Sequence, residues 1–212
     1  MRATLCSRNA HKARELEVLM PGWSIDILDA DDYPPETGDT YYENASIKAA
    51  FGRTRVPGWT IGEDSGLEVM TLGGRPGLHS ARYAQEGAPA IARLLGELDG
   101  REDRSARYVS ELVAIAPGGE ELRGTGILEG RIADEPRGSG GFGFDPVFIP
   151  DGEGLTVAEL GDDWKSSHSH RARAARALLE AVERARCRLV AGPGGCRTQT
   201  SPGVRHDSRE PP

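Results

Sequence analysis

Two runs of alternating apolar residues, joined by a short turn, constrain the fold of this chain most strongly. The runs cover residues 107–115 and 121–128, and Pro117-Gly118-Gly119 lies between them. This pattern predicts a β-hairpin, because successive side chains of a strand point to opposite faces of a sheet and Pro and Gly favour turns. Shorter strands are predicted at 2–6, 24–28, 59–61, 67–70 and 145–149. We therefore expect a β-sheet that includes this hairpin.

Helical patterns alternate with these strands. They cover residues 10–20, with Asn9 as the expected N-cap, and residues 40–55, 88–98 and 170–189. The last is the clearest, because its small and apolar residues recur at helical spacing on one face: Ala174, Leu178, Ala181 and Ala185. The mixture predicts an α/β or α+β body over residues 1–190. Residues 191–212 have no such period and few large apolar side chains, so we expect a disordered tail.

Composition limits the classes of protein to which the chain can belong. Hydrophobic residues make up 37% of the 212 residues, and a chain of this length buries about 70% of its surface, enough for a sizeable core. Acidic residues outnumber basic ones by 33 to 26, which argues against nucleic acid as a partner. No apolar run approaches the ~20 residues of a membrane helix, and the N-terminus resembles no signal peptide. We therefore expect no membrane contact and a cytoplasmic location.

The segment between the first strand and the first helix is a candidate phosphate site. It contains Ser7, Arg8, Asn9, Ala10, His11 and Lys12. A helix N-terminus presents unpaired N–H groups that bind phosphate, and Lys12 adds a positive charge within the first turn. The alternative interpretation is a capped helix with a surface lysine.

Two adjacent carboxylates, Glu63 and Asp64, follow a short apolar strand. Carboxylates at a strand end suit a hard cation such as Mg²⁺, or a base that activates water. Ser65 adds a hydroxyl group, and Gly66 allows close approach of the backbone. The alternative is an acidic turn without a ligand.

Two glutamates in the preceding segment have different predicted roles. Thr40 and Glu43 have the spacing of a capping box, in which the glutamate bonds back to the start of the helix. Glu36 lies in the loop before this helix and has no such local role. Glu36 is therefore the freer of the two to ligate a metal.

The glycine-rich stretch 138–143 matches G-x-G-x-x-G but does not predict a dinucleotide site. That fingerprint must open a helix, whereas Asp145-Pro146 and a β-branched run follow here. A turn that presents Phe142 and Phe144 to a flat ring is one interpretation, and a pair of core aromatics is the other.

Cationic side chains and histidines gather at 165–171, which we expect to form the start of the last helix. The spacing of His168 and His170 could hold a metal, but no nearby Cys or carboxylate completes a ligand set. A capped helix start with exposed charges is the alternative.

Six blocks of residues, taken together and in order, resemble the inosine triphosphate pyrophosphatase family. The blocks are Ser7-x-Asn9-x-x-Lys12, residues 37–49, Glu63-Asp64-Ser65-Gly66-Leu67, residues 72–83, residues 140–146, and Lys165 with Ser169-His170-Arg171. The resemblance covers roughly residues 2–185.

This resemblance implies an elongated α/β fold with two lobes around a long mixed sheet, and an active-site cleft between the lobes. It implies a homodimer that hydrolyses non-standard purine nucleoside triphosphates (dITP, ITP and XTP) to the monophosphate and pyrophosphate. It also implies Mg²⁺ as the cofactor.

The resemblance further implies roles for individual residues. Asp64 would be the general base and a metal ligand, with Glu36 as a second metal ligand. The remaining matches would bind substrate: Ser7, Arg8, Asn9, Ala10, His11 and Lys12 the triphosphate, Ser65 the nucleotide, Phe142, Gly143, Phe144 and Asp145 the base and sugar, and Lys165, His170 and Arg171 the base. Arg8 stands where many members have glycine, Glu36 is matched only loosely, and the tail has no counterpart.

Two other functions remain open on sequence alone. One is a pyrophosphatase of another family that prefers modified pyrimidine or guanine nucleotides. The other is a nucleotide-binding protein without catalysis, against which the paired carboxylates Glu63 and Asp64 argue.

Overall fold

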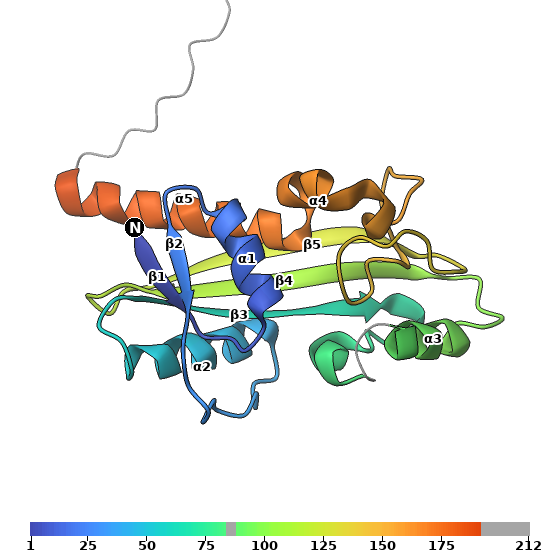
Figure 1. Cartoon of the computed structure of the whole chain (residues 1–212), viewed down its shortest axis with the longest axis horizontal. Helices are drawn as coiled ribbons and strands as arrows, with labels where there is room; N and C mark the ends of the chain where they lie inside the picture. The colour runs from blue at the N-terminus through green and yellow to red at the C-terminus, as the bar shows by residue number, and fades with distance from the viewer. Residues whose placement is uncertain (84–87, 192–212) are drawn as a thin grey trace, which may run out of the picture.

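The predicted hairpin forms, and it belongs to a six-stranded sheet with the strand order β2-β1-β3-β4-β5-β6. The computed structural model describes residues 1–83 and 88–191 (Figure 1). The strands are β1 (Arg2–Leu5), β2 (Ser24–Ile27), β3 (Trp59–Val69), β4 (Ser105–Ile115), β5 (Glu121–Ile132) and β6 (Phe148–Pro150). β1 runs parallel to β2 and β3, and β3 to β6 are antiparallel. The sheet is therefore mixed, as the family resemblance implied.

Helices cover both faces of this sheet. They are α1 (Ala10–Leu19), α2 (Tyr41–Arg53), α3 (Ala88–Glu97), α4 (Val157–His168) and α5 (His170–Ala191), with 3-10 turns η1 (Met70–Leu72) and η2 (Gly77–Arg82). Figure 1 shows α1, α4 and α5 on one face and α2 and α3 on the other. The caps of the first two helices follow the sequence: Asn9 accepts from the backbone of α1, and Thr40 and Glu43 form the predicted capping box of α2.

The burial of β4 and β5 reflects which faces the helices cover. Residues 108–114 of β4 are all buried, because α2 packs on one face of that strand and α5 on the other. β5 alternates strictly between exposed and buried residues, since α5 is the only helix of residues 1–83 and 88–191 that packs closely against it. Gly124 and Gly126 allow this contact: a Cβ atom at Gly126 would lie 1.9 Å from the carbonyl oxygen of His170.

Two apolar clusters lie along the long strands. One joins β1, α1 and α5 and includes Leu5, Leu16, Ile61, Leu112, Leu178 and Val182. The other joins the far halves of β3 and β4 with α3 and β6 and includes Leu67, Val69, Leu94, Tyr108, Leu128 and Phe148. Strand β3 contributes Ile61 to the first cluster and Leu67 to the second, so its polar residues 63–65 fall between the two. This arrangement confirms the predicted two-lobed α/β fold.

Three local predictions were wrong. β3 continues through Glu63 and Asp64, so these carboxylates lie inside a strand and not at its end or in a turn. The strand predicted at 145–149 is shorter and shifted, because the carboxylate of Asp145 accepts the N–H of Phe142 and closes a turn there. Helix α4 was not predicted, and Lys165 lies in α4, ahead of the last helix. Its signal was the capping box formed by Thr156 and Glu159.

The C-terminal prediction concerns residues that the structure describes only in part. Helix α5 continues to Ala191, and the expected tail beyond it lies outside the described residues. Among the helices of residues 1–83 and 88–191, none combines the length and the apolar character that a membrane span requires.

Candidate active site

The candidate site lies where the pairing of β1 with β3 ends. β1 pairs with β3 from Ala3 opposite Trp59 to Leu5 opposite Ile61, and the pairing stops there. Adjacent side chains of a strand point to opposite faces, so Glu63 points toward α1 and α5 and Asp64 toward α2. Groups from both faces of the sheet therefore meet at this edge of β3. Because they face apart, the two carboxylates cannot hold one ion together, and the sequence-based interpretation of Glu63 and Asp64 as a pair around one cation is wrong.

Glu63 is the buried acceptor of two cations. Its Oε2 lies 2.5 Å from Nζ of Lys12, and its Oε1 lies 3.2 Å from Nη2 of Arg171. Burial alone would raise the pKa of Glu63, but the charges of Lys12 and Arg171 hold this pKa well below its ordinary value. Lys12, predicted to reach phosphate, thus reaches the cleft and is paired there with Glu63.

Asp64 is almost buried on the other face, against α2. Its Oδ1 lies 3.1 Å from Nζ of Lys48, and its Oδ2 accepts a hydrogen bond of 3.2 Å from the side-chain amide of Asn44. Burial raises the pKa of Asp64, and the neighbouring charge of Lys48 opposes this only in part. A carboxylate with a raised pKa at the edge of a cleft suits a general base.

Lys48 occupies a cradle of three oxygen atoms. Its Nζ lies 2.6 Å from Oε1 of Glu36, 3.1 Å from Oδ1 of Asp64 and 3.0 Å from the carbonyl oxygen of Glu63. Glu36 also pairs with Arg82 at 3.3 Å. Carboxylate and carbonyl oxygens around one cation form the donor set that Mg²⁺ prefers, usually one or two carboxylates with the rest supplied by water and phosphate. Glu36 and Asp64 therefore fit a divalent cation.

The predicted phosphate loop is ordered by its own side chains. Ser7 Oγ accepts the N–H of Asn9, and Asn9 Oδ1 accepts the N–H groups of His11 and Lys12 at 2.9 and 3.4 Å. Arg8 points elsewhere: it donates to the carbonyl of Asp31, and its guanidinium lies 5.1 Å from the ring centre of Tyr33.

Phe142 presents its ring to two cations, and the expected contact of this ring with a flat ring of a ligand stays a prediction. Nζ of Lys165 lies 4.7 Å from the ring centre, and Cζ of Arg171 lies 5.6 Å from it. Asp145 holds the turn beneath, because its Oδ2 accepts from the N–H of Phe142 and from Lys165, each at 2.9 Å. Phe144 is instead a core residue, buried against Tyr83, as the other interpretation expected.

His170 and Tyr108 line the same cavity as this turn. The two rings are stacked, with centres 4.5 Å apart and planes 10° from parallel. Burial, together with the charge of Arg171, holds the pKa of His170 well below its ordinary value. His170 is therefore a neutral imidazole at physiological pH.

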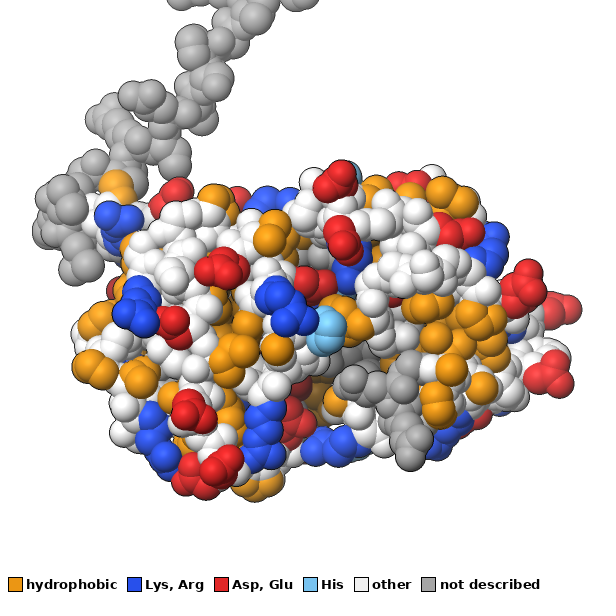
Figure 2. Space-filling model, in the orientation of Figure 1, with side chains coloured by type: hydrophobic (Ala, Val, Ile, Leu, Met, Phe, Trp, Pro, Cys, Tyr) orange, Lys and Arg blue, Asp and Glu red, His pale blue; other side chains and the backbone are white. Residues whose placement is uncertain are grey.

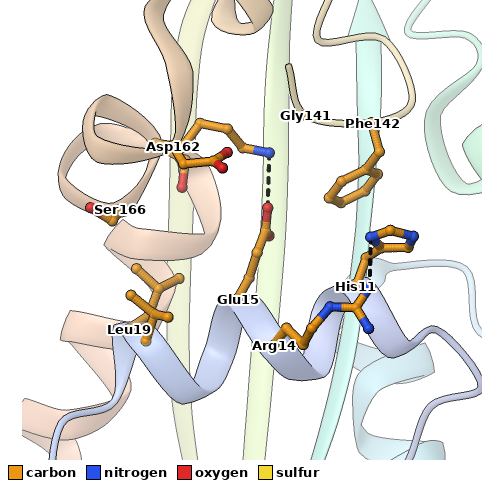
Figure 3. Close-up of a pocket in the computed structure, with 11 residues that line it drawn as sticks. His11, Arg14, Glu15, Leu19, Gly141, Phe142, Asp162 and Ser166 are labelled. Atoms are coloured by element: carbon orange, nitrogen blue, oxygen red, sulfur yellow. Dashed lines mark hydrogen bonds and ion pairs between the residues drawn. The ribbon is translucent and has the colours of Figure 1, made fainter. Parts of the chain in front are cut away.

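Glu15 was missed by sequence reasoning and connects the cations of this region. Its carboxylate lies 2.8 Å from Nζ of Lys165 and also pairs with Nη1 of Arg171. Figure 3 shows Glu15 extending from α1 across the cavity, with Phe142 above His11. The available signal was its position three residues after Lys12, on the same helix face.

Two adjoining cavities share Phe142 and Lys165 as walls. The wider, about 320 Å³, lies between α1 and α4, and the narrower, about 100 Å³, lies deeper between the lobes. The face drawn in Figure 2 is hollowed near its middle, with acidic and basic side chains on the rim. Predicted residues that line the narrow cavity are Asn9, Lys12, Ser65, Phe142, Gly143, Phe144, Asp145, Lys165, His170 and Arg171. His11 lines the wide cavity, whereas Ser7, Arg8, Ala10, Asp64 and Glu36 line neither.

Known proteins are similar in sequence to this chain over most of its length. Residues 3–181 match the Ham1 family. A dITP/XTP pyrophosphatase of Gloeobacter violaceus is 41% identical over 182 residues, which cover 85% of this chain and 93% of that protein. A dITP/XTP pyrophosphatase of Geobacillus kaustophilus is 42% identical over 200 residues, which cover 90% of this chain and 96% of that protein.

Solved structures share the fold. The Ham1 protein of Staphylococcus aureus superposes with a TM-score of 0.76 at 34% identity, covering 88% of this chain and all of that one. A nucleoside-triphosphatase / dITP/XTP pyrophosphatase of Mycobacterium abscessus gives a TM-score of 0.66 at 38% identity. The match covers 84% of this chain and 99% of that one. These similarities confirm the resemblance that the six sequence blocks predicted.

Proposed function

The chain belongs to the Ham1 family, and we propose that it hydrolyses the non-standard purine nucleoside triphosphates dITP, ITP and XTP to the monophosphate and pyrophosphate. Such a hydrolase keeps deaminated purines out of DNA and RNA. The observation that carries this proposal is the narrow cavity, which is lined by the buried cations Lys165 and Arg171, by the stacked ring of His170, and by Ser65. On β3, Ser65 follows Asp64, a carboxylate with a raised pKa.

Binding of the triphosphate is assigned to the start of α1. A triphosphate carries several negative charges, so cations and N–H donors contribute more to its binding than apolar area. Lys12 and the backbone N–H groups beside Asn9 supply them. Lys12 would then divide its hydrogen bonds between phosphate and Glu63, while Arg171 keeps Glu63 paired.

The chemical step is assigned to Asp64. Its carboxylate accepts the proton of the attacking water, and the side-chain amide of Asn44 holds it at the edge of β3. Glu36 and Asp64 are the residues that would hold Mg²⁺. When bound there, the cation supplies charge stabilisation for the phosphate oxygens and the leaving pyrophosphate.

Selectivity for the base is assigned to the cationic wall of the cavity. Arg171 and Lys165 are donors only, so they favour the 6-oxo group of hypoxanthine and xanthine over the 6-amino group of adenine. An adenine amine placed against these donors leaves both sides unpaired, and mismatches of this kind give large discrimination.

Release of pyrophosphate from ITP, dITP, XTP, ATP and GTP, with and without Mg²⁺, tests the function. We expect rapid release from the first three, little from ATP, whose base carries the 6-amino group, and none without the cation. GTP shares the 6-oxo group and differs from ITP by its 2-amino group, so its rate shows whether that group is also distinguished. Preferential hydrolysis of modified pyrimidine or guanine nucleotides would favour the first alternative function. Tight binding of ITP without release would favour the second.

We also propose that the protein acts as a cytoplasmic homodimer, the location expected from the sequence and the assembly implied by the family resemblance. Light scattering coupled to size-exclusion chromatography measures the mass in solution. A mass of one chain, 22.7 kDa, at micromolar concentration would contradict the dimer.

A further inference from the structure

Lys48 lies between the carboxylates of Glu36 and Asp64, which come from different segments of the chain. The side chain rises from α2 and is only 11% exposed. It contacts Glu36, from the loop before α2, and both Asp64 and the backbone of Glu63, from β3. These contacts bring together the two residues that the proposed function assigns to the metal.

The cradle around Lys48 can hold one cation at a time. The ammonium lies between 2.6 and 3.1 Å from its three oxygen acceptors, so it fills the position from which a small cation would contact the same oxygens. A divalent ion brought close to this ammonium would also be repelled by its charge, and burial weakens solvent screening of that repulsion. Glu36 and Asp64 therefore become available only when Lys48 moves away.

We propose that Lys48 is a positioning residue that keeps divalent cations off Glu36 and Asp64 until a nucleotide is present, so that metal and nucleotide enter together. This inference rests on the proposed function. The phosphate groups give the displaced ammonium a new anionic partner close by, since Lys12 and the start of α1 lie on the other side of the same β3 edge. Without phosphate, Glu36 and Asp64 keep the ammonium in its present position.

The test measures binding of Mn²⁺ alone to the full chain, without nucleotide, by titration calorimetry. We expect no saturable binding to the wild-type protein. Lys48→Met removes the ammonium and keeps the length of the side chain, and it should bind Mn²⁺ at least about tenfold more tightly, because a neighbouring charge is removed from a buried site. Adding Glu36→Gln to Lys48→Met should abolish this gain.

Lys165→Met is the matched control. Lys165 is another nearly buried ammonium between two carboxylates, 2.8 Å from Glu15 and 2.9 Å from Asp145. Its removal takes the same charge out of another nearly buried position, and we expect no gain in Mn²⁺ binding, because Arg171 still holds Glu15 and the N–H of Phe142 still bonds Asp145. An equal gain in Lys165→Met would overturn the inference, because it would show a general effect of charge.

Thermal melts provide a second readout if Lys48→Met folds poorly. Mn²⁺ alone should raise the melting temperature of Lys48→Met and of Lys48→Gln, and leave that of the wild-type protein unchanged. Wild-type protein that binds Mn²⁺ as tightly as Lys48→Met, or variants that gain no affinity, would show that Lys48 serves only as a structural ion pair. If the wild-type enzyme still releases pyrophosphate from ITP, the proposed function stands and only the inference about Lys48 fails.

Discussion

The guanidinium of Arg171 donates two hydrogen bonds to a single oxygen of Glu63, from Nε at 3.3 Å and from Nη2 at 3.2 Å. Arg171 is 2% exposed and Glu63 is fully buried. The pair joins the first turn of α5 to the middle of β3, across 108 positions of the sequence. Because Arg171 also lines the narrow cavity, the stability of the fold and the shape of the site depend on the same contact.

Glu63→Gln should therefore destabilise the protein. Removing one partner of a buried ion pair costs roughly 3–5 kcal/mol. Glu15 still pairs with Arg171 in this variant, so we expect a loss at the lower end of that range. Because the folded pKa of Glu63 is depressed, its contribution to stability is complete above the unfolded value of 4.5 and is lost as the pH falls below it. Urea denaturation at pH 7 and between pH 3 and 5 measures both effects. If the free energy of unfolding fell equally in acid for the wild-type protein and for Glu63→Gln, this role of Glu63 would be contradicted.

Asp64→Asn should lower kcat by at least about 10²-fold and leave the fold intact, since it keeps the shape and removes the basicity. Steady-state release of pyrophosphate from ITP measures the rate, and circular dichroism checks the fold. Glu111→Gln is the control, because Glu111 lies opposite Asp64 on β4 and bonds Arg123, outside both cavities. A near-normal rate in Asp64→Asn would remove Asp64 from the mechanism.

The pH dependence of the reaction should report the buried position of Asp64. A general base works deprotonated, so kcat/KM for ITP should fall as the pH drops through the pKa of Asp64. Burial raises this pKa above its ordinary value of 3.8, so the acid limb of the profile should lie above that value. A profile that stays flat down to the ordinary value would argue that another group takes the proton.

Arg171→Lys should reduce selectivity more than it reduces the chemical step. Lysine keeps the positive charge beside Glu63 but cannot reproduce the planar fork of donors. Loss of a charge-assisted hydrogen bond to the 6-oxo group costs roughly 1.5–3 kcal/mol. The value of kcat/KM should fall accordingly for ITP and change little for ATP, so that their ratio shrinks. Equal losses for both nucleotides would assign Arg171 to phosphate or to the fold.

Two glycines of β5 contact different turns of α5. Gly126 lies against the turn that carries site residues, and Gly124 lies against the next turn. A Cβ atom at Gly126 would lie 1.9 Å from the oxygen of His170, and one at Gly124 would lie 2.2 Å from that of Ala174. Both Gly126→Ala and Gly124→Ala should lower the melting temperature. Only Gly126→Ala should also raise the KM for ITP, because it displaces the turn that carries His170 and Arg171. An equal KM in both variants would contradict this distinction.

The sequence predicted the residues of the site better than their arrangement. Lys12, Phe142 and Arg171 were identified because each stands in a short motif whose order along the chain matches a known family. Glu15 and Lys48 were given no role, because their importance comes from partners in other segments. Glu15 meets Arg171, 156 positions later, and Lys48 meets Asp64, 16 positions later.

The sequence by itself determined the features that depend on near neighbours. The hairpin of β4 and β5 and the caps of α1 and α2 are closed by groups a few residues apart, so local chemistry specifies them. Only the tertiary structure decided that β3 continues through Glu63 and Asp64, because β4 pairs with it along that whole stretch. That pairing sends the two carboxylates to opposite faces, one to Arg171 and one to Lys48, since alternation in a strand is fixed only where the strand persists.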